Sequence, residues 1–250
     1  MKRYPIKLKN SPLVETICEI RFNTNIPSEA IIGVVFQSVS SLLNDPKIVN
    51  LPLSQMPIEV RSNIPDIDYQ QLYQIKSDNF VIGVGAKVVT FSQRKPYTGW
   101  SIYSKFILDA INKLISCNLF DEITRVGLRY INILDDSLLK VSNFKLSYSG
   151  KEVTNETTSM TRLEERINDS LILVFNLNNN ILVGVNQQKP KKASMIDIDV
   201  IQEISIPLIK DNGQVLVSSF NKLHDMVNQR FFDLLNDSFL NSLGPMYVEK

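Results

Sequence analysis

Two stretches of the chain share one organisation, which constrains the fold more than any other feature of the sequence. Residues 80–91 form an apolar, hairpin-like run that leads into an amphipathic helix over residues 100–115, and residues 196–206 lead in the same way into a helix over residues 215–235. A strand pair followed by a helix that returns across it is typical of an α+β domain with antiparallel sheet. We therefore predict a mainly antiparallel, curved sheet with about three long helices packed on one face.

The same repeat bears on domain organisation. A chain of 250 residues can form one large domain or two small ones. We predict a single co-folding domain over residues 1–250, with pseudo-duplicated halves, residues 1–134 and 135–250, as a subdivision. The two stretches match in organisation and not in residues, so the duplication remains a hypothesis.

Composition and charge exclude several classes of protein. The chain carries 27 basic and 26 acidic residues, a formal net charge of +1, so no long-range field steers it to nucleic acid or to an anionic membrane. With only two cysteines, Cys18 and Cys117, we expect reduced thiols and no disulfide scaffold. Residues 1–10 lack the apolar core of a signal peptide, and no apolar run is long enough to span a bilayer. We expect a soluble, cytoplasmic protein with no membrane partner.

Periodicity places the other elements. Residues 13–22 alternate as a half-buried strand, residues 28–43 carry the apolar stripe of a helix, and residues 72–76 pair with residues 80–91 across a short turn. The prolines of residues 46–68 leave room only for short edge strands such as residues 58–61. Further strands are expected over residues 125–134, 144–149, 162–167, 171–176, 182–185 and 195–206, with loops over residues 150–160 and 187–194.

No stretch carries a specific catalytic or cofactor motif. Gly83 and Gly85 form a GxG without a following helix, which indicates a bulge or the close approach of a packed helix and not a phosphate loop. His224 is the single histidine, and it lies beside the apolar stripe of its helix, where a hydrogen-bonded boundary residue is the usual interpretation. The sequence therefore predicts no catalytic residue, no metal ligand and no cofactor.

Charged residues on the polar sides of the strands are the one constellation of interest. If the apolar sides face the helices, these residues converge on the opposite face of the sheet. They are Glu15, Glu19, Arg21, Arg125, Arg129, Asp197 and Asp199. Cross-strand ion pairs that keep the face soluble are the leading interpretation; a contact surface for protein or nucleic acid, and a Mg²⁺ or Ca²⁺ site on Asp197 and Asp199, are the alternatives. Lys189, Lys191 and Lys192 lie in the predicted loop and could contact phosphate, although such lysines are usually only solvated.

Three segments carry a family resemblance. Residues 12–15 (PLVE) with residues 19–22 (EIRF), residues 125–132 (RVGLRYIN), and the C-terminal residues 223–225 (LHD) with residues 231–232 (FF) resemble the signature segments of a sporadically distributed prokaryotic protein family of unknown function. The resemblance spans nearly the whole chain, which implies one co-folding unit. The family's patchy distribution implies accessory genes, including phage-defence or toxin–antitoxin loci, and the family supplies no catalytic residues to carry over.

Three functional hypotheses follow. The first is a non-enzymatic binding or scaffold protein that contacts a protein from the same locus or a second copy of itself. The second is a nucleic-acid-binding protein that places Arg21, Arg125, Arg129 and the lysines at 189, 191 and 192 on phosphates. The third is a metal-dependent enzyme that uses Asp197 and Asp199.

Overall fold

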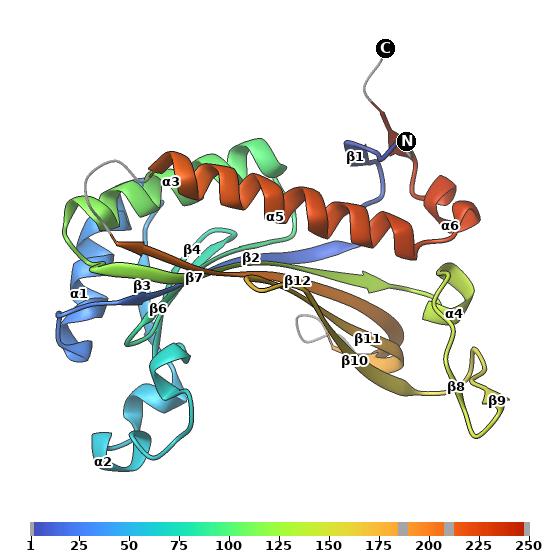
Figure 1. Cartoon of the computed structure of the whole chain (residues 1–250), viewed down its shortest axis with the longest axis horizontal. Coiled ribbons are helices and arrows are strands. Elements are labelled where there is room, and N and C mark those ends of the chain that lie inside the picture. Colours follow the sequence, from blue (N-terminus) through green and yellow to red (C-terminus); the bar gives the residue numbers. More distant parts are fainter. Residues whose placement is uncertain (1–2, 185–189, 208–212, 248–250) are drawn as a thin grey trace. The chain divides into compact units, whose positions relative to one another are not determined.

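The computed structural model describes residues 3–184, 190–207 and 213–247, and within them the chain has an α+β fold with one large antiparallel sheet and about six helices (Figure 1). The sheet has nine strands in the order β10-β11-β12-β7-β2-β6-β5-β4-β3, and two small two-stranded sheets pair β1 with β13 and β8 with β9. The predicted fold class is confirmed at this level. Lys189 lies outside the described residues.

The strands and helices have the following bounds. The strands are β1 (Lys7–Leu8), β2 (Leu13–Asn23), β3 (Lys47–Asn50), β4 (Tyr73–Ser77), β5 (Phe80–Val84), β6 (Val88–Arg94), β7 (Glu122–Leu134), β8 (Ser147–Tyr148), β9 (Lys151–Glu152), β10 (Ser159–Asn168), β11 (Leu171–Val183), β12 (Lys191–Pro207) and β13 (Pro245–Met246). The α-helices are α1 (Ser28–Val39), α2 (Ile58–Arg61), α3 (Trp100–Ser116), α4 (Leu138–Val141), α5 (Gly213–Leu234) and α6 (Asp237–Ser242), and short 3-10 helices are η1 (Ser40–Leu42), η2 (Pro52–Gln55) and η3 (Ile67–Tyr69).

The chain divides into two compact units, and each unit is assembled from separate stretches of sequence. Unit 1 comprises Met1–Val14, Arg129–Val200 and His224–Lys250, and unit 2 comprises Glu15–Leu128 and Ile201–Leu223. Strands β2, β7 and β12 and helix α5 contribute residues to both units.

Unit 2 is built on the antiparallel meander of β2, β6, β5, β4 and β3. On β2, Thr16, Cys18, Ile20 and Phe22 are fully buried, as the alternation of residues 13–22 predicts. Helix α3 packs against this layer, where the Phe106 ring contacts the rings of Phe80 and Phe91. The buried Tyr103 hydroxyl donates a 2.6 Å hydrogen bond to the Phe91 carbonyl. Tyr103, Ile107 and Leu114 of α3 are buried, so the apolar side of the amphipathic helix predicted over residues 100–115 belongs to the core.

Close neighbouring atoms explain Gly83 of β5 and Gly85 in the turn that follows. A Cβ at Gly83 would lie 2.3 Å from Gln71 Cδ, and one at Gly85 would lie 2.2 Å from the Gln70 carbonyl oxygen. The predicted bulge or helix contact is wrong, because the crowding groups belong to Gln70, Gln71, Val88 and Thr90 and not to a helix, and the pairing of β5 has no register shift.

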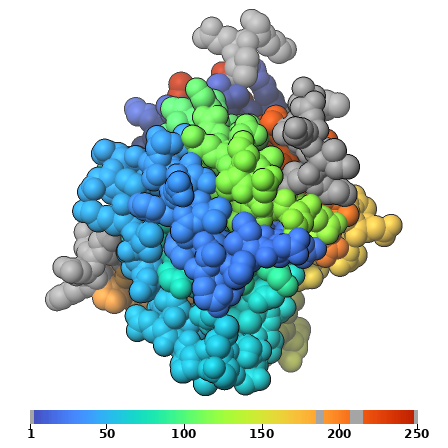
Figure 2. Space-filling model, turned by 90° about the vertical axis from the view of Figure 1, so that its left-hand side faces the viewer, coloured from blue at the N-terminus to red at the C-terminus, as the bar shows by residue number. Residues whose placement is uncertain are grey.

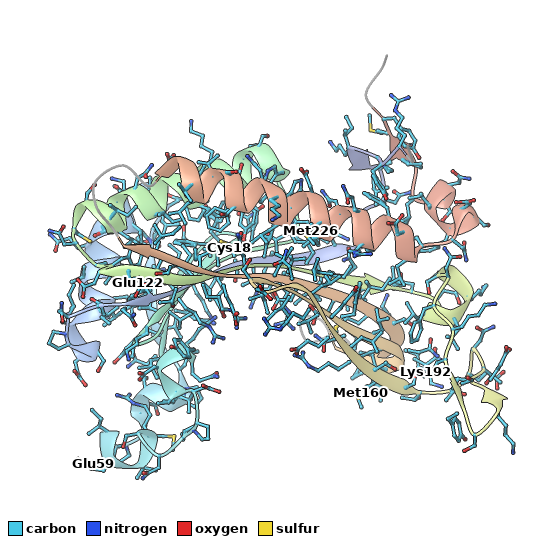
Figure 3. All side chains as sticks on the ribbon, viewed as in Figure 1. Cys18, Glu59, Glu122, Met160, Lys192 and Met226 are labelled. Carbon is cyan, nitrogen blue, oxygen red and sulfur yellow. The ribbon has the colours of Figure 1, made fainter. Side chains whose placement is uncertain are left out.

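Residues 52–70 of unit 2 protrude from the strands on the side opposite α3 (Figures 1 and 2). Glu59 of α2 lies at the tip of this protrusion in Figure 3. The predicted edge strand over residues 58–61 is wrong, because these residues form α2. Pro57 precedes the helix with a φ of −53°, which suits the start of a helical turn as well as it suits an edge strand.

Unit 1 contains the long antiparallel hairpin of β10 and β11, followed by β12. Helix α4 precedes this hairpin in sequence, and the Asn143 amide after it donates to the Leu234 carbonyl at the end of α5. The Tyr4 hydroxyl donates to the Asp233 carboxylate of α5, which ties the N-terminal segment to the same helix.

Several strand boundaries in unit 1 differ from those predicted. The expected strands over residues 171–176 and 182–185 are one strand, β11, and β12 begins at Lys191, inside the predicted loop of residues 187–194. The predicted strand over residues 144–149 reduces to β8, and part of the predicted loop over residues 150–160 pairs as β9 and the start of β10.

Candidate functional site

Asp197 of β12 is the most buried of the predicted site residues. Its side chain is 1% exposed, and the Arg129 guanidinium of β7 binds it side-on, with Nε donating to Oδ1 at 2.7 Å and Nη2 donating to Oδ2 at 2.6 Å. Asn176 of β11 donates to Oδ2 at 3.0 Å. The bidentate arginine compensates the charge of this buried carboxylate, and three hydrogen bonds to its two oxygens come from within unit 1.

This geometry is unfavourable for coordination of a metal ion by Asp197. Both of its oxygens already accept hydrogen bonds, and the Arg129 guanidinium that contacts both of them would repel a cation bound here. Asp199 follows at the next alternate position of β12 and is partly exposed. Among the described residues, no group of three or more His, Cys, Asp or Glu side chains could hold a metal ion.

Glu19 of β2 is the centre of a second charged cluster, in unit 2. Its Oε1 accepts a hydrogen bond from Arg21 Nε at 2.8 Å. The same oxygen lies 3.3 Å from Arg125 Nε, but the N–H of Arg125 is too poorly aligned with it to form a hydrogen bond. Arg21 also stacks over the Tyr69 ring, 4.4 Å from its centroid. Glu15 lies nearby in sequence and pairs with Arg94 of β6 at 3.4 Å.

The structure therefore separates the predicted charged residues into ion pairs within each unit. Glu19, Arg21 and Arg125 meet in unit 2, whereas Arg129 and Asp197 meet in unit 1. Because each arginine faces a carboxylate, its charge is partly neutralised before any phosphate could approach.

The lysines at the start of β12 are surface residues. Lys191 Nζ lies 2.7 Å from Asp135 Oδ1, and both side chains are exposed. Lys192 is exposed and is labelled in Figure 3. An exposed ion pair contributes little to stability, typically about 0 to 1 kcal/mol.

His224 of α5 lies in a half-buried polar contact within unit 1. Its Nδ1 is 2.8 Å from the Tyr130 hydroxyl of β7, and its Nε2 is 2.9 Å from Asn228 Nδ2, one helical turn further along α5. Burial lowers the pKa of His224 from 6.5 to about 4, so the ring is neutral at pH 7. A neutral, hydrogen-bonded ring between two neutral polar groups fills the role of a boundary residue.

Strand β10 is the feature that the sequence did not single out. It lies at the end of the nine-stranded order, and beyond it no further strand pairs within the described residues. Ten residues long, it is exposed along almost its whole length on both faces. An edge strand presents a row of main-chain donors and acceptors that another strand can bind.

The side chains of β10 include large exposed apolar groups. Met160, labelled in Figure 3, is 77% exposed, Leu163 is 46% exposed, and Ile167 is 36% exposed. Arg162, Glu164, Glu165 and Arg166 separate them, and Arg162 Nη2 donates to Glu164 Oε2 at 2.9 Å along the same face. Strand addition to a sheet edge needs accessible main chain and side chains that can enter a partner's pockets, and β10 offers both.

The edge strand at the other end of the sheet, β3, differs from β10. β3 has only four residues and begins with Lys47, two devices by which proteins keep an edge unpaired. β10 has neither a proline nor a lysine, and its bulge, between Arg166 and Asn168, lies at its far end. Most of β10 is thus left as a regular ladder.

A cavity of about 450 Å³ lies in unit 2, between the start of α1 and the protruding residues 52–70. Apolar side chains such as Ile58, Ile64 and Leu72 line it together with Arg61 and Asp68. Asp68 pairs with Lys87 at 2.9 Å and raises the pKa of that lysine, so its charge is already compensated.

A scan against protein-family models and a search of curated proteins found no match to this chain. Among the described helices, none is both long and apolar enough to cross a membrane.

Proposed function

We propose that the protein is a non-enzymatic binding or scaffold protein that acts through protein–protein contacts, with β10 as its docking strand. The observation that supports this proposal is the ten-residue edge strand with exposed Met160 and Leu163. Addition of a strand to such an edge supplies main-chain hydrogen bonds for affinity, and the exposed side chains supply specificity.

The charged residues favour this function over the alternatives. A nucleic-acid surface needs basic groups available to phosphate, whereas Arg21 and Arg129 each donate hydrogen bonds to a carboxylate. A metal-dependent enzyme needs carboxylate oxygens available to the ion, whereas those of Asp197 accept from Arg129 and Asn176.

The proposal retains the finer organisation expected from the sequence. It includes a curved sheet with three long helices on one face, two related halves in a single co-folding domain, and a cytoplasmic location. It also includes a place in an accessory locus, with a partner encoded there or a second copy of the chain.

The proposal is tested by recovery of the tagged protein from its native host, followed by size-exclusion chromatography with light scattering. The wild-type protein should carry a stoichiometric protein partner, identical or different, and Leu163→Glu should lose it because a charge replaces the apolar contact. Ile48→Glu is the matched control, since Ile48 lies on the β3 edge and is similarly exposed, at 44%.

Loss of the partner in both variants, or in neither, would argue against β10 as the docking strand. Recovery of nucleic acid in place of protein, seen as a raised absorbance at 260 nm, would favour the nucleic-acid hypothesis.

A further inference from the structure

We infer that β10 pairs antiparallel with β10 of a second copy of the chain, in the register that sets Leu163 opposite Leu163 of the second copy. This inference rests on the proposed function and names its partner. It extends the sheet of each copy across a two-fold axis and gives a closed dimer with one shared edge.

The two-fold symmetry limits the registers available. In an antiparallel pair related by an axis perpendicular to the sheet, opposite residues project to the same face, so one residue lies opposite itself at the centre. The regular part of β10 pairs with β11 from Ser159 to Arg166 before the bulge, and Leu163 lies near its middle. Centring on Leu163 therefore uses nearly all of the regular ladder.

The charges of β10 are complementary about Leu163. Arg162 and Glu164 flank it, so in this register Arg162 lies opposite Glu164 of the second copy, and Glu164 opposite Arg162 of the second copy. The two residues already form a 2.9 Å ion pair along one strand, so the dimer would join two such pairs into a ring of four alternating charges. Opposite charges directly across a strand pair are favourable, and like charges are not.

The neighbouring registers place like charges opposite each other. Centring on Glu164 sets Glu164 against itself and Arg162 against Arg166, and centring on Arg162 or on Glu165 sets that residue against its own copy. Among the four central residues 162–165, only Leu163 gives a register without a like-charge contact.

The exposed apolar side chains also find contacts in this register. Leu163 meets its own copy at the centre of one face. On the other face, Met160 lies opposite Arg166 of the second copy, whose aliphatic stem can cover the methionine. The register thus reduces the exposure of Met160 and Leu163, two of the large exposed apolar groups of unit 1.

Disulfide formation tests the register directly. In a Cys117→Ser background, Leu163→Cys should give a covalent dimer under mild oxidation, because directly opposite Cα atoms are about 4.5 to 5.5 Å apart and a disulfide spans this distance. Thr161→Cys is the matched control. Its copy lies four residues away along the facing strand, about 13 Å at about 3.3 Å per residue, and should not cross-link. Equal cross-linking of the two variants would overturn the register.

Charge reversal tests the ion pairs. Arg162→Glu and Glu164→Arg should each weaken dimerisation about tenfold or more, because each creates two like-charge contacts. A mixture of these two variants should recover the dimer. One copy then carries acidic groups at both positions, 162 and 164, and the other carries basic groups at both, so each contact across the pair joins opposite charges. Light scattering of each variant and of the mixture measures this, and failure of the mixture to associate would contradict the inference.

The outcomes separate this inference from the proposed function. If the wild-type protein is a monomer but recovers a different protein that Leu163→Glu loses, β10 is a docking strand and self-pairing is wrong. If the wild-type protein is a dimer that Leu163→Glu leaves intact, both are wrong.

Discussion

Arg129 holds the Asp197 carboxylate through two hydrogen bonds of 2.7 and 2.6 Å, yet the two partners differ sharply in exposure. The Asp197 side chain is 1% exposed, whereas that of Arg129 is 41% exposed. Removal of one partner is costly when the other is left as a buried charge, and water can solvate only the arginine.

We therefore expect Arg129→Met to destabilise the protein by about 3 kcal/mol, because it leaves the buried Asp197 carboxylate without its cationic partner. Asp197→Asn should destabilise it by about 1 kcal/mol. The double variant should be more stable than Arg129→Met alone, since no buried charge remains. Urea denaturation of the three variants measures these differences. Equal losses in the two single variants would show that the buried charge does not determine the cost.

The half-buried His224 makes stability depend on pH. Its folded pKa is about 4 and its unfolded value is near 6.5, so above pH 6.5 the ring is neutral in both states. As the pH falls from 6.5 to about 4, only the unfolded chain takes up the proton, and stability falls by about 3 kcal/mol at 1.36 kcal/mol per pH unit.

His224→Gln should abolish this loss, because the sequence contains no other histidine. The measurement is the free energy of unfolding of both proteins at several pH values between 7 and 4. Carboxylates whose pKa is lowered, such as Asp136, contribute the same acid-side loss to both proteins. Parallel curves for the wild type and the variant would contradict a half-buried, neutral His224.

Substitution by alanine should change the stability of the protein differently at three glycines. Gly85→Ala should cost about 3 kcal/mol, because the new Cβ would meet a backbone carbonyl at 2.2 Å. Gly83→Ala should cost less, about 2 kcal/mol, because the nearest neighbours of the new Cβ are side-chain atoms, Gln71 Cδ at 2.3 Å and Thr90 Oγ1 at 2.5 Å.

Gly33→Ala is the control for these glycine variants. Gly33 lies in α1 with no atom within 4 Å of its Cβ position, and alanine should stabilise the helix by about 1 kcal/mol. Thermal unfolding of the three variants checks this order, and a neutral Gly85→Ala would mean that residues 70 and 85 are not in close contact.

The two cysteines should differ in reactivity. Cys18 is fully buried on β2, and burial raises its pKa, so its thiolate is scarce and inaccessible. Cys117 lies at the end of α3 and is partly exposed. A disulfide reagent at pH 8 should label Cys117 rapidly and Cys18 only on unfolding, and Cys117→Ser should remove the fast phase. Rapid labelling of that variant would place Cys18 at the surface.

Sequence periodicity predicted the elements that bury one apolar side. β2, α1, α3 and α5 were all predicted near their observed positions, because a stripe at period 2 or 3.6 has to face the core. The prediction for the short segment of residues 58–61 was wrong. Residues 58–61 carry a pattern that suits a strand or a helical turn, and only the local backbone after Pro57 decides between them.

Polar residues inside β11 explain another error. Asn176 and Asn179 resemble loop residues in sequence, but Asn176 donates to Asp197 and Asn179 accepts from the Leu138 amide. These partners are distant in the chain, so local patterns could not show that the strand continues through them.

The candidate site was predictable only in part. The alternation of charged residues on β2, β7 and β12 indicated ion pairs, and Arg129–Asp197 and Glu19–Arg21 are such pairs. The identity of the edge strand was not predictable, because the pattern of residues 162–167 is compatible with any place in a sheet. Strand order depends on long-range pairing, which one sequence does not encode locally.

The most direct test of β10 as a docking strand is photo-cross-linking in the native host from a photoreactive residue at position 163, with position 48 on β3 as the control. The account predicts a cross-link from position 163 to a protein, either a second copy of the chain or another partner, and none of comparable yield from position 48. Equal yields from the two positions, or no protein adduct from position 163, would contradict it.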